Sequence, residues 1–312
     1  MILSATPGQS GGVITTSAAP AATTEEHDDL KTHRSDTVNH ATTSTPRRAG
    51  LIGAGNVGTA IATRLVDLGW NVDVANSRGP HTLHDFARLT GAHAVTIDEI
   101  GPNVDLLILA IPLASIPGLL HVIQRLDPDT VVVDTGNYVP PRDGSIQDVI
   151  DGLPETAWVA EQLGIPVVKA FNNIVAGSLA TAGTPAGTTS RVALPVCGDD
   201  PRARTVVMQL VEELGFTAYD GGSLDASWRQ QPGQPAYCTN PTITELASLL
   251  ERADRAAGPR RRDQALKVAL KLPATFPADV LTRASRFSSG LDRWKPAAWL
   301  ATARVGLSLL RP

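Results

Sequence analysis

Short apolar runs alternate with amphipathic segments along most of this 312-residue chain. The nearly continuous apolar run at residues 104–111 indicates a strand buried on both faces of a sheet. Further strands are predicted at residues 51–52, 71–75, 92–95, 130–134, 167–171, 191–198 and 217–220. Helices are predicted between them at residues 57–68, 119–126, 154–163 and 203–214, with another beginning at Pro80. Because strands and helices alternate, the pattern predicts an α/β fold with a doubly wound, mostly parallel Rossmann sheet.

Both ends of the chain follow different patterns. Residues 1–47 are rich in Thr, Ser, Ala and Pro and poor in large apolar residues, so we predict a disordered segment. Residues 240–312 read as a helical tail. Its apolar stretch at residues 296–310 is interrupted by Arg304 and is shorter than the roughly 20 residues that cross a bilayer. It therefore predicts a packed helix or a subunit interface rather than a membrane anchor.

A dinucleotide-binding fingerprint lies at Gly53, Gly55 and Gly58, which have G-x-G-x-x-G spacing directly after an apolar strand. Gly53 permits a tight turn, Gly55 lets a diphosphate approach the backbone, and Gly58 lets the next helix pack on the strand. The N-terminus of that helix offers free N–H groups to the anion. A second strand at residues 71–75 completes the β-α-β unit that this fingerprint requires.

The residues after the second strand indicate the choice of nicotinamide cofactor. NAD-preferring sites usually carry Asp or Glu here, whereas this chain has Asn76, Ser77 and Arg78. The Arg78 guanidinium and the Ser77 hydroxyl suit a 2′-phosphate, and no carboxylate is present to repel it. One charge-assisted hydrogen bond of about 1.5 to 3 kcal/mol gives roughly tenfold or more preference for NADP(H). The alternative is that Arg78 is a solvated loop residue.

Other candidate site residues follow the later strands, since ligands of open α/β sheets bind beyond the carboxyl ends of the strands. Ala110, Ile111 and Pro112 would lie where a nicotinamide ribose passes, or they are simply packed. Asn137 could hold a carboxamide or ribose through its amide, or it could stabilise its own turn.

Lys169 lies within an apolar strand, where a charged side chain requires a partner. It is a candidate general acid or substrate anchor, or else one member of a structural ion pair with an aspartate. Trp228 and Arg229 precede a proline turn. They could form the floor of a binding site for a planar ligand, or they could form a subunit contact.

Composition argues against several classes of protein. A formal net charge of -4 argues against a nucleic-acid partner. The two cysteines, Cys197 and Cys238, are far apart in the sequence and predict no disulfide framework, which indicates a reducing, cytoplasmic compartment. We expect no metal site, because His27, His33 and His40 have no partners at metal-ligand spacing. His81 and His84 are three residues apart and could share a helix face, but no third ligand is near them in the sequence. The sequence offers no G-x-S-x-G nucleophile elbow between a strand and a helix, and no H-E-x-x-H motif.

Four segments together resemble the NADP oxidoreductase family that includes the coenzyme F420-dependent NADP reductases. They are Ile52-Gly-Ala-Gly-Asn-Val-Gly58, Asn76-Ser-Arg78, Val168-Lys-Ala-Phe-Asn172 and Gly222-Ser-Leu224. The same segments resemble the cytosolic reductase domain of the six-transmembrane metalloreductases. The resemblance covers residues 50–235, so the N-terminal segment, the helical tail and the lack of a membrane span are departures from it.

The resemblance implies a Rossmann domain at residues 48–168, a smaller C-terminal portion at residues 169–239 and the tail at residues 240–312. The residues that match the family's NADP-binding motifs are Gly53, Gly55, Asn56, Val57, Gly58, Ser77 and Arg78. By position, Ala110, Pro112, Asn137, Phe171 and Asn172 would border the two redox rings.

The implied activity is hydride exchange between NADP(H) and a second planar coenzyme, either deazaflavin F420 or a flavin, in a cytoplasmic homodimer. Such a transfer is a task of positioning, so no catalytic triad is expected. One alternative is an NADPH-dependent imine or carbonyl reductase, with Lys169 as proton donor. The other is a non-catalytic NADPH-sensing protein.

Overall fold

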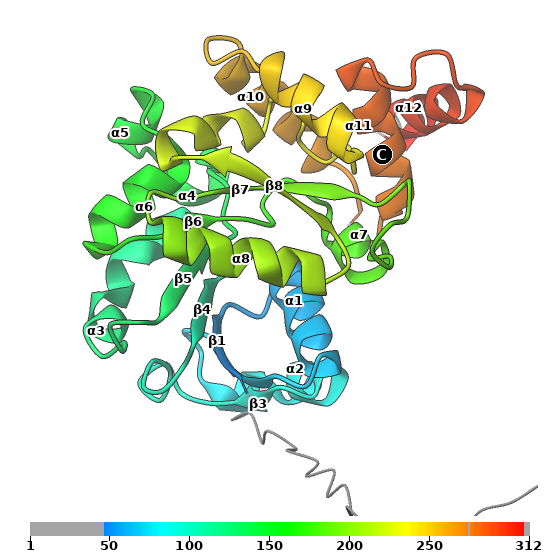
Figure 1. Cartoon of the computed structure of the whole chain (residues 1–312). Helices are drawn as coiled ribbons and strands as arrows, with labels where there is room; N and C mark the ends of the chain where they lie inside the picture. The colour runs from blue at the N-terminus through cyan, green and yellow to red at the C-terminus, as the bar shows by residue number, and fades with distance from the viewer. Residues whose placement is uncertain (1–46, 274, 309–312) are drawn as a thin grey trace, which may run out of the picture. The chain divides into compact units, whose positions relative to one another are not determined.

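The fold is organised around an eight-stranded sheet with the order β3-β2-β1-β4-β5-β6-β7-β8 (Figure 1). The computed structural model describes residues 47–273 and 275–308. Its strands are β1 (Arg48–Ile52), β2 (Asn71–Ala75), β3 (His93–Ala94), β4 (Leu106–Leu109), β5 (Val131–Asp134), β6 (Val168–Lys169), β7 (Ala193–Cys197) and β8 (Thr217–Gly222). Strands β1 to β6 run parallel, β7 is antiparallel to β6, and β8 is parallel to β7. The predicted doubly wound, mostly parallel sheet is therefore confirmed.

Helices cover both faces of the sheet and extend beyond it. The α-helices are α1 (Asn56–Asp67), α2 (His84–Thr90), α3 (Leu120–Ile123), α4 (Pro140–Asp143), α5 (Gln147–Ile150), α6 (Glu155–Leu163), α7 (Ala176–Thr181), α8 (Pro201–Glu213), α9 (Ile243–Glu251), α10 (Gly258–Ala269), α11 (Ala278–Ser289) and α12 (Pro296–Ser308). Three short 3-10 helices are η1 (Pro80–Thr82), η2 (Leu113–Leu119) and η3 (Leu224–Gln230). All described residues belong to one structural unit, Thr45–Pro312.

The period-two alternation of each strand divides its side chains between two apolar layers. In β4, Leu106 and Ile108 belong to the layer formed with α1 and α8, which lie in front of the sheet in Figure 1. Leu107 and Leu109 belong to the opposite layer, formed with η2, α3 and α6. Both layers are buried, which explains why the strand reads as a continuous apolar run.

The structure departs from the predicted elements in several places. Residues 95–105 connect β3 to β4 without a helix, so the alternation of strand and helix is interrupted there. Of the helix predicted at residues 119–126, only the single turn α3 is α-helical. The segment before it, η2, is a 3-10 helix that contains Pro117, which lacks an amide donor. Strand β6 stops at Lys169 rather than residue 171, because Phe171 adopts a positive φ of 61°.

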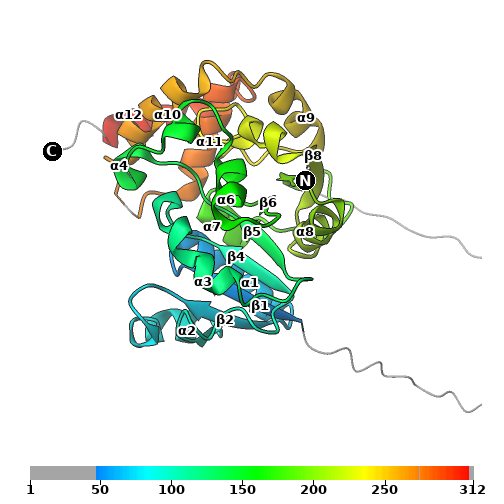
Figure 2. The same cartoon turned by 90° about the vertical axis from the view of Figure 1, so that its left-hand side faces the viewer.

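The tail helices α9 to α12 gather beside β7 and β8 at one end of the sheet (Figures 1 and 2). Helix α9 begins with a capping box in which Thr242 and Glu245 cap each other's backbone N–H groups. No helix in the described ranges is long and apolar enough to span a membrane. The predicted disordered segment, apart from Arg47, and its histidines lie outside these ranges, and the predicted division at residues 168 and 239 stays a prediction.

A charged cluster ties α11 to the start of α9. The Arg286 guanidinium donates to Glu245, with Nη2 2.8 Å from Oε1, and to Asp292, with Nε 2.6 Å from Oδ2. Burial would raise the pKa of Glu245, but hydrogen bonds from Arg286 and the Thr242 amide hold it below its usual value. The Arg286 hydrogen bond likewise lowers the pKa of Asp292 against a smaller effect of burial.

We expect Arg286→Met to lower the free energy of unfolding at pH 7 by about 1.5 to 3 kcal/mol, because it removes charge-assisted hydrogen bonds from two carboxylates. Both folded-state pKa values are depressed, so this stability is present above the unfolded values near pH 4 and is lost as the pH falls through the folded values. Denaturant unfolding at pH 7 and pH 3 measures it, and the difference between variant and wild type should shrink at pH 3. Arg283→Met is the control, since Arg283 pairs only with exposed Asp279 among the described residues and should change stability by less than about 1 kcal/mol.

Candidate nicotinamide cofactor site

The predicted site residues gather at one edge of the sheet, where the parallel strands β1, β2, β4, β5 and β6 end. Strand β1 lies between β2 and β4, so the chain crosses to the other side of the sheet at this point. This is the topological switch point, outside which open α/β sheets bind their ligands. Asn137 and Asn172, which are far apart in the sequence, are brought into direct contact here.

The glycine turn after β1 has a different steric requirement at each position. A Cβ on Gly53 would lie 2.3 Å from the Ala110 carbonyl oxygen, and its φ is +113°. A Cβ on Gly58 would lie 2.2 Å from the Gly53 carbonyl oxygen, because α1 packs closely on the turn. A Cβ on Gly55 would meet nothing within 4 Å. The protein therefore needs glycine at two positions for its fold, whereas at Gly55 it leaves open space.

The N-terminus of α1 suits an anion. Gly55 is the N-cap residue, no side chain caps the helix, and its first turn carries no acidic residue. The first N–H groups of a helix have no partner within that helix, and the helix dipole favours negative charge near them. Gly55 and Asn56 are exposed and Val57 is half-buried, so a diphosphate can reach these backbone groups.

The turn after β2 is built by Asn76. Its side-chain oxygen accepts the Arg78 backbone N–H at 2.9 Å, and its amide donates to Thr82 Oγ1 at 2.9 Å. Sequence reasoning used Asn76 only as the absence of a carboxylate and missed this structural role. Ser77 and Arg78 are exposed, and among the described residues no group hydrogen-bonds or ion-pairs with the Arg78 guanidinium. Its donors are therefore available to a 2′-phosphate.

The segment after β4 forms the floor beneath the glycine turn. The Ala110 N–H donates to the Ile52 carbonyl at 2.8 Å, and the Ala110 carbonyl lies directly under Gly53. Ala110 thus has the packing role that was its alternative interpretation. Ala110, Ile111 and Pro112 are all half-buried, so each keeps some exposed surface.

Asn137 and Asn172 form a reciprocal amide pair at the ends of β5 and β6. Asn137 Nδ2 donates to the Asn172 carbonyl at 2.9 Å, and Asn172 Nδ2 donates to Asn137 Oδ1 at 3.0 Å. Asn137 is half-buried, whereas Asn172 is almost fully buried. Phe171, between this pair and β6, is fully buried in the apolar core, so its side chain offers no surface to a ring.

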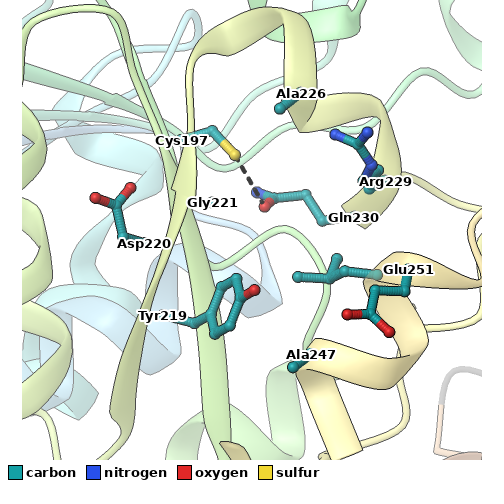
Figure 3. A pocket seen from close by; sticks show the side chains of 10 residues that line it. Cys197, Tyr219, Asp220, Gly221, Ala226, Arg229, Gln230, Ala247 and Glu251 are labelled. Atoms are coloured by element: carbon teal, nitrogen blue, oxygen red, sulfur yellow. Dashed lines mark hydrogen bonds between the residues drawn. The ribbon is translucent and has the colours of Figure 1, made fainter.

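The amide pair continues to two residues that sequence reasoning did not assign to the site, Gln230 and Cys197. Gln230 Nε2 donates to Asn172 Oδ1 at 2.9 Å, and the Cys197 thiol donates to Gln230 Oε1 at 3.6 Å (Figure 3). Burial raises the pKa of Cys197 to about 12, so the thiol remains protonated and can donate. Both residues line a pocket of about 330 Å³ between β8, η3 and α9.

Lys169 is fully buried, and oxygen atoms surround its ammonium group. The Nζ atom lies 2.5 Å from the Gly136 carbonyl oxygen, 3.3 Å from Asp134 Oδ2 and 3.4 Å from Glu155 Oε2. Burial raises the pKa of Glu155, and the charge of Lys169 opposes that effect. The structure therefore favours the ion-pair interpretation of Lys169 over that of an accessible general acid.

A parallel sheet with a glycine turn at its switch point, followed by an uncapped helix, defines the class of Rossmann-type NAD(P)-dependent oxidoreductases. Residues 48–138 match the family model described as NADP oxidoreductase, coenzyme F420-dependent. The protein belongs to this family. The matched segment contains the glycine turn, Ser77, Arg78, Ala110, Pro112 and Asn137, whereas Lys169 and Asn172 lie beyond it.

Three relatives extend this comparison. The crystal structure of a hypothetical protein, SMa0349 from Sinorhizobium meliloti, is 32% identical, with a TM-score of 0.54 over 63% of this chain and 95% of that one. Metalloreductase STEAP3 of Rattus norvegicus is 29% identical over 188 residues, which are 60% of this chain and 36% of that protein. The putative protein YjhV of Escherichia coli K12 is 38% identical over 77 residues, 25% of this chain and 56% of that protein. The chain thus spans about half or less of the length of STEAP3 and of YjhV.

Proposed function

We propose that this protein transfers a hydride between NADP(H) and a second planar redox coenzyme, deazaflavin F420 or a flavin. The observation that carries the NADP(H) part of the proposal is the turn after β2, where no described residue pairs with the Arg78 guanidinium and no carboxylate occupies the position that would bind a ribose diol. The description of the matched family supports the second coenzyme. Exposed Gly55 and the uncapped α1 N-terminus supply the matching diphosphate site.

The proposed roles of the residues are to bind and to orient. When NADPH is bound, its nicotinamide supplies the hydride, and the protein has to hold the two reacting carbons about 3 to 3.5 Å apart and aligned. Ser77 and Arg78 would anchor the 2′-phosphate, and Gly53, Gly55, Asn56, Val57 and Gly58 would seat the diphosphate. Ala110, Pro112 and Asn137 would border the nicotinamide end.

A reductase of imines or carbonyl compounds is the less favoured proposal. Such a reaction needs a proton donor in contact with the substrate, and Lys169 was the candidate. Lys169 has no exposed surface, and its ammonium is already surrounded by three oxygen atoms. An NADPH-sensing protein would use the same binding residues without turnover.

The decisive experiment incubates purified protein with NADPH and separately with F420, FMN, FAD, a ferric chelate or a cyclic imine, and follows nicotinamide absorbance. We expect oxidation of NADPH with F420 or a flavin, and faster oxidation of NADPH than of NADH. Turnover with the imine alone would support the reductase alternative. Tight NADPH binding without oxidation by any of these acceptors would refute the enzyme proposal and support a sensor.

A further inference from the structure

Three side chains form a buried charged cluster beneath the turn after β5. The cluster consists of Lys169 on β6, Asp134 at the end of β5 and Glu155 at the start of α6, whose side chains are 0%, 1% and 2% exposed. The Thr156 hydroxyl donates to Asp134 Oδ2 at 2.5 Å and completes the surroundings of that carboxylate. We call these three charged residues the Lys169 cluster.

The Lys169 cluster binds both peptide groups of Gly136. Asp134 Oδ1 accepts the Gly136 N–H at 2.7 Å, and Lys169 Nζ donates to the Gly136 carbonyl at 2.5 Å. The fit is close, since a Cβ on Gly136 would lie 2.9 Å from both Asp134 Oδ1 and Leu113 Cδ1. A change in the cluster would therefore move the backbone of this turn.

Asn137 follows Gly136 directly in the chain, and its carbonyl and side-chain amide are both hydrogen-bonded. Its carbonyl accepts Arg142 Nη2 at 2.7 Å, and its side-chain amide is paired with Asn172. The position of its backbone also depends on Gly136, the preceding residue, and thus on the Lys169 cluster. The cluster is buried, whereas Asn137, in the turn that follows the end of β5, is half-buried.

Stability alone does not explain why three charges are buried at this place. Desolvation of buried ions costs several kcal/mol each, and apolar residues of similar volume often stabilise a protein equally well or better. Apolar side chains, however, cannot bind the N–H and the carbonyl of Gly136. A buried lysine that donates to a backbone carbonyl is suited to fixing the geometry of a turn.

We infer that Lys169 is a positioning residue. Through the Lys169 cluster it sets the place of Gly136 and Asn137, so that the Asn137 amide meets the nicotinamide end of NADP(H) in the alignment needed for hydride transfer. This inference rests on the proposed function. Lys169 itself contacts neither the cofactor nor the second coenzyme.

The test compares Lys169→Met with the combined variant Lys169→Met, Asp134→Asn, Glu155→Gln. The combined variant leaves no uncompensated buried charge, and the amide introduced at position 134 keeps an acceptor for the Gly136 N–H, so this variant should fold even where the single variant does not. We expect kcat with the acceptor found in the panel to fall about 10- to 100-fold, since a misplacement of about 1 Å can cost 10²-fold. The Kd for NADPH should change less than about twofold, and the primary isotope effect with 4-deuterated NADPH should rise as hydride transfer becomes rate-limiting.

Arg191→Met is the matched control, because Arg191 is also a buried cation, paired with Glu212 near the start of β7. It should lower the melting temperature while leaving kcat and the isotope effect unchanged at temperatures where the protein is folded. If the Lys169 variants behave in the same way as Arg191→Met, the cluster has only a structural role and the inference is wrong.

A second readout separates this inference from the proposed function. If the wild type oxidises NADPH with none of the acceptors in the panel, the proposed function fails, and hydrogen exchange of residues 135–138 then tests the positioning role. In Lys169→Met or in the combined variant, these amides should exchange at least about tenfold faster, and NADPH should protect them less than in the wild type. Unchanged exchange and unchanged protection by NADPH would overturn the inference.

Discussion

Gly55→Ala should abolish most of the affinity for NADPH while leaving the protein folded. A Cβ at residue 55 meets no protein atom within 4 Å, and the φ of −84° suits alanine. The melting temperature should therefore change by less than about 2 °C, the equivalent of less than about 1 kcal/mol in a domain of this size. The new methyl group would occupy the space through which the diphosphate approaches the backbone, so we expect the Kd for NADPH to rise about tenfold or more.

The same substitution at Gly53 should act mainly on stability. There the Cβ would lie 2.3 Å from the Ala110 carbonyl oxygen at a φ of +113°, so backbone strain and overpacking act together. We expect a loss of about 3 to 5 kcal/mol in the free energy of unfolding. Thermal unfolding and calorimetric titration with NADPH measure the two effects for each variant.

Gly306→Ala in α12 is the control for both substitutions, because its Cβ also meets nothing within 4 Å and it lies in the tail. It should change neither NADPH affinity nor, beyond about 1 kcal/mol, stability. An unchanged Kd in Gly55→Ala would mean that the diphosphate does not lie on this turn.

Arg78→Ala should weaken NADPH binding far more than NADH binding. Only NADPH carries the 2′-phosphate, and a charge-assisted hydrogen bond of about 1.5 to 3 kcal/mol corresponds to about tenfold or more in Kd. Binding of NADH should change less than about twofold. Titration of the wild type and the variant with both cofactors gives the four Kd values that are needed.

Arg88→Ala separates this specific contact from a general effect of charge. Arg88 is an exposed cation on α2 that pairs with Asp85, so removing it changes the net charge by the same amount. It should leave the ratio of the two Kd values unchanged. Equal losses of NADPH and NADH affinity in Arg78→Ala would contradict the assignment of the cofactor.

Much of the fold could be predicted from the sequence, because its signals are local. The period-two burial of β4 and the helical spacing in α1 and α8 depend on residues within a few positions of each other. The start of α8 is likewise local, because the Asp200 side chain accepts the Arg202 and Ala203 N–H groups there. The bounds of β6 could not be predicted, since the positive φ of Phe171 depends on how the residues around it pack.

By itself, the sequence determined the Rossmann sheet, the glycine turn and the arginine that follows β2, since φ preference, side-chain period and charge are properties of neighbouring residues. Only the tertiary structure decided the partners of Lys169, which are 35 and 14 residues away at Asp134 and Glu155. The same holds for the amide chain from Asn137 through Asn172 to Gln230, whose links span 35 and 58 residues. These contacts depend on strand order and register, because both set which side chains meet across the sheet.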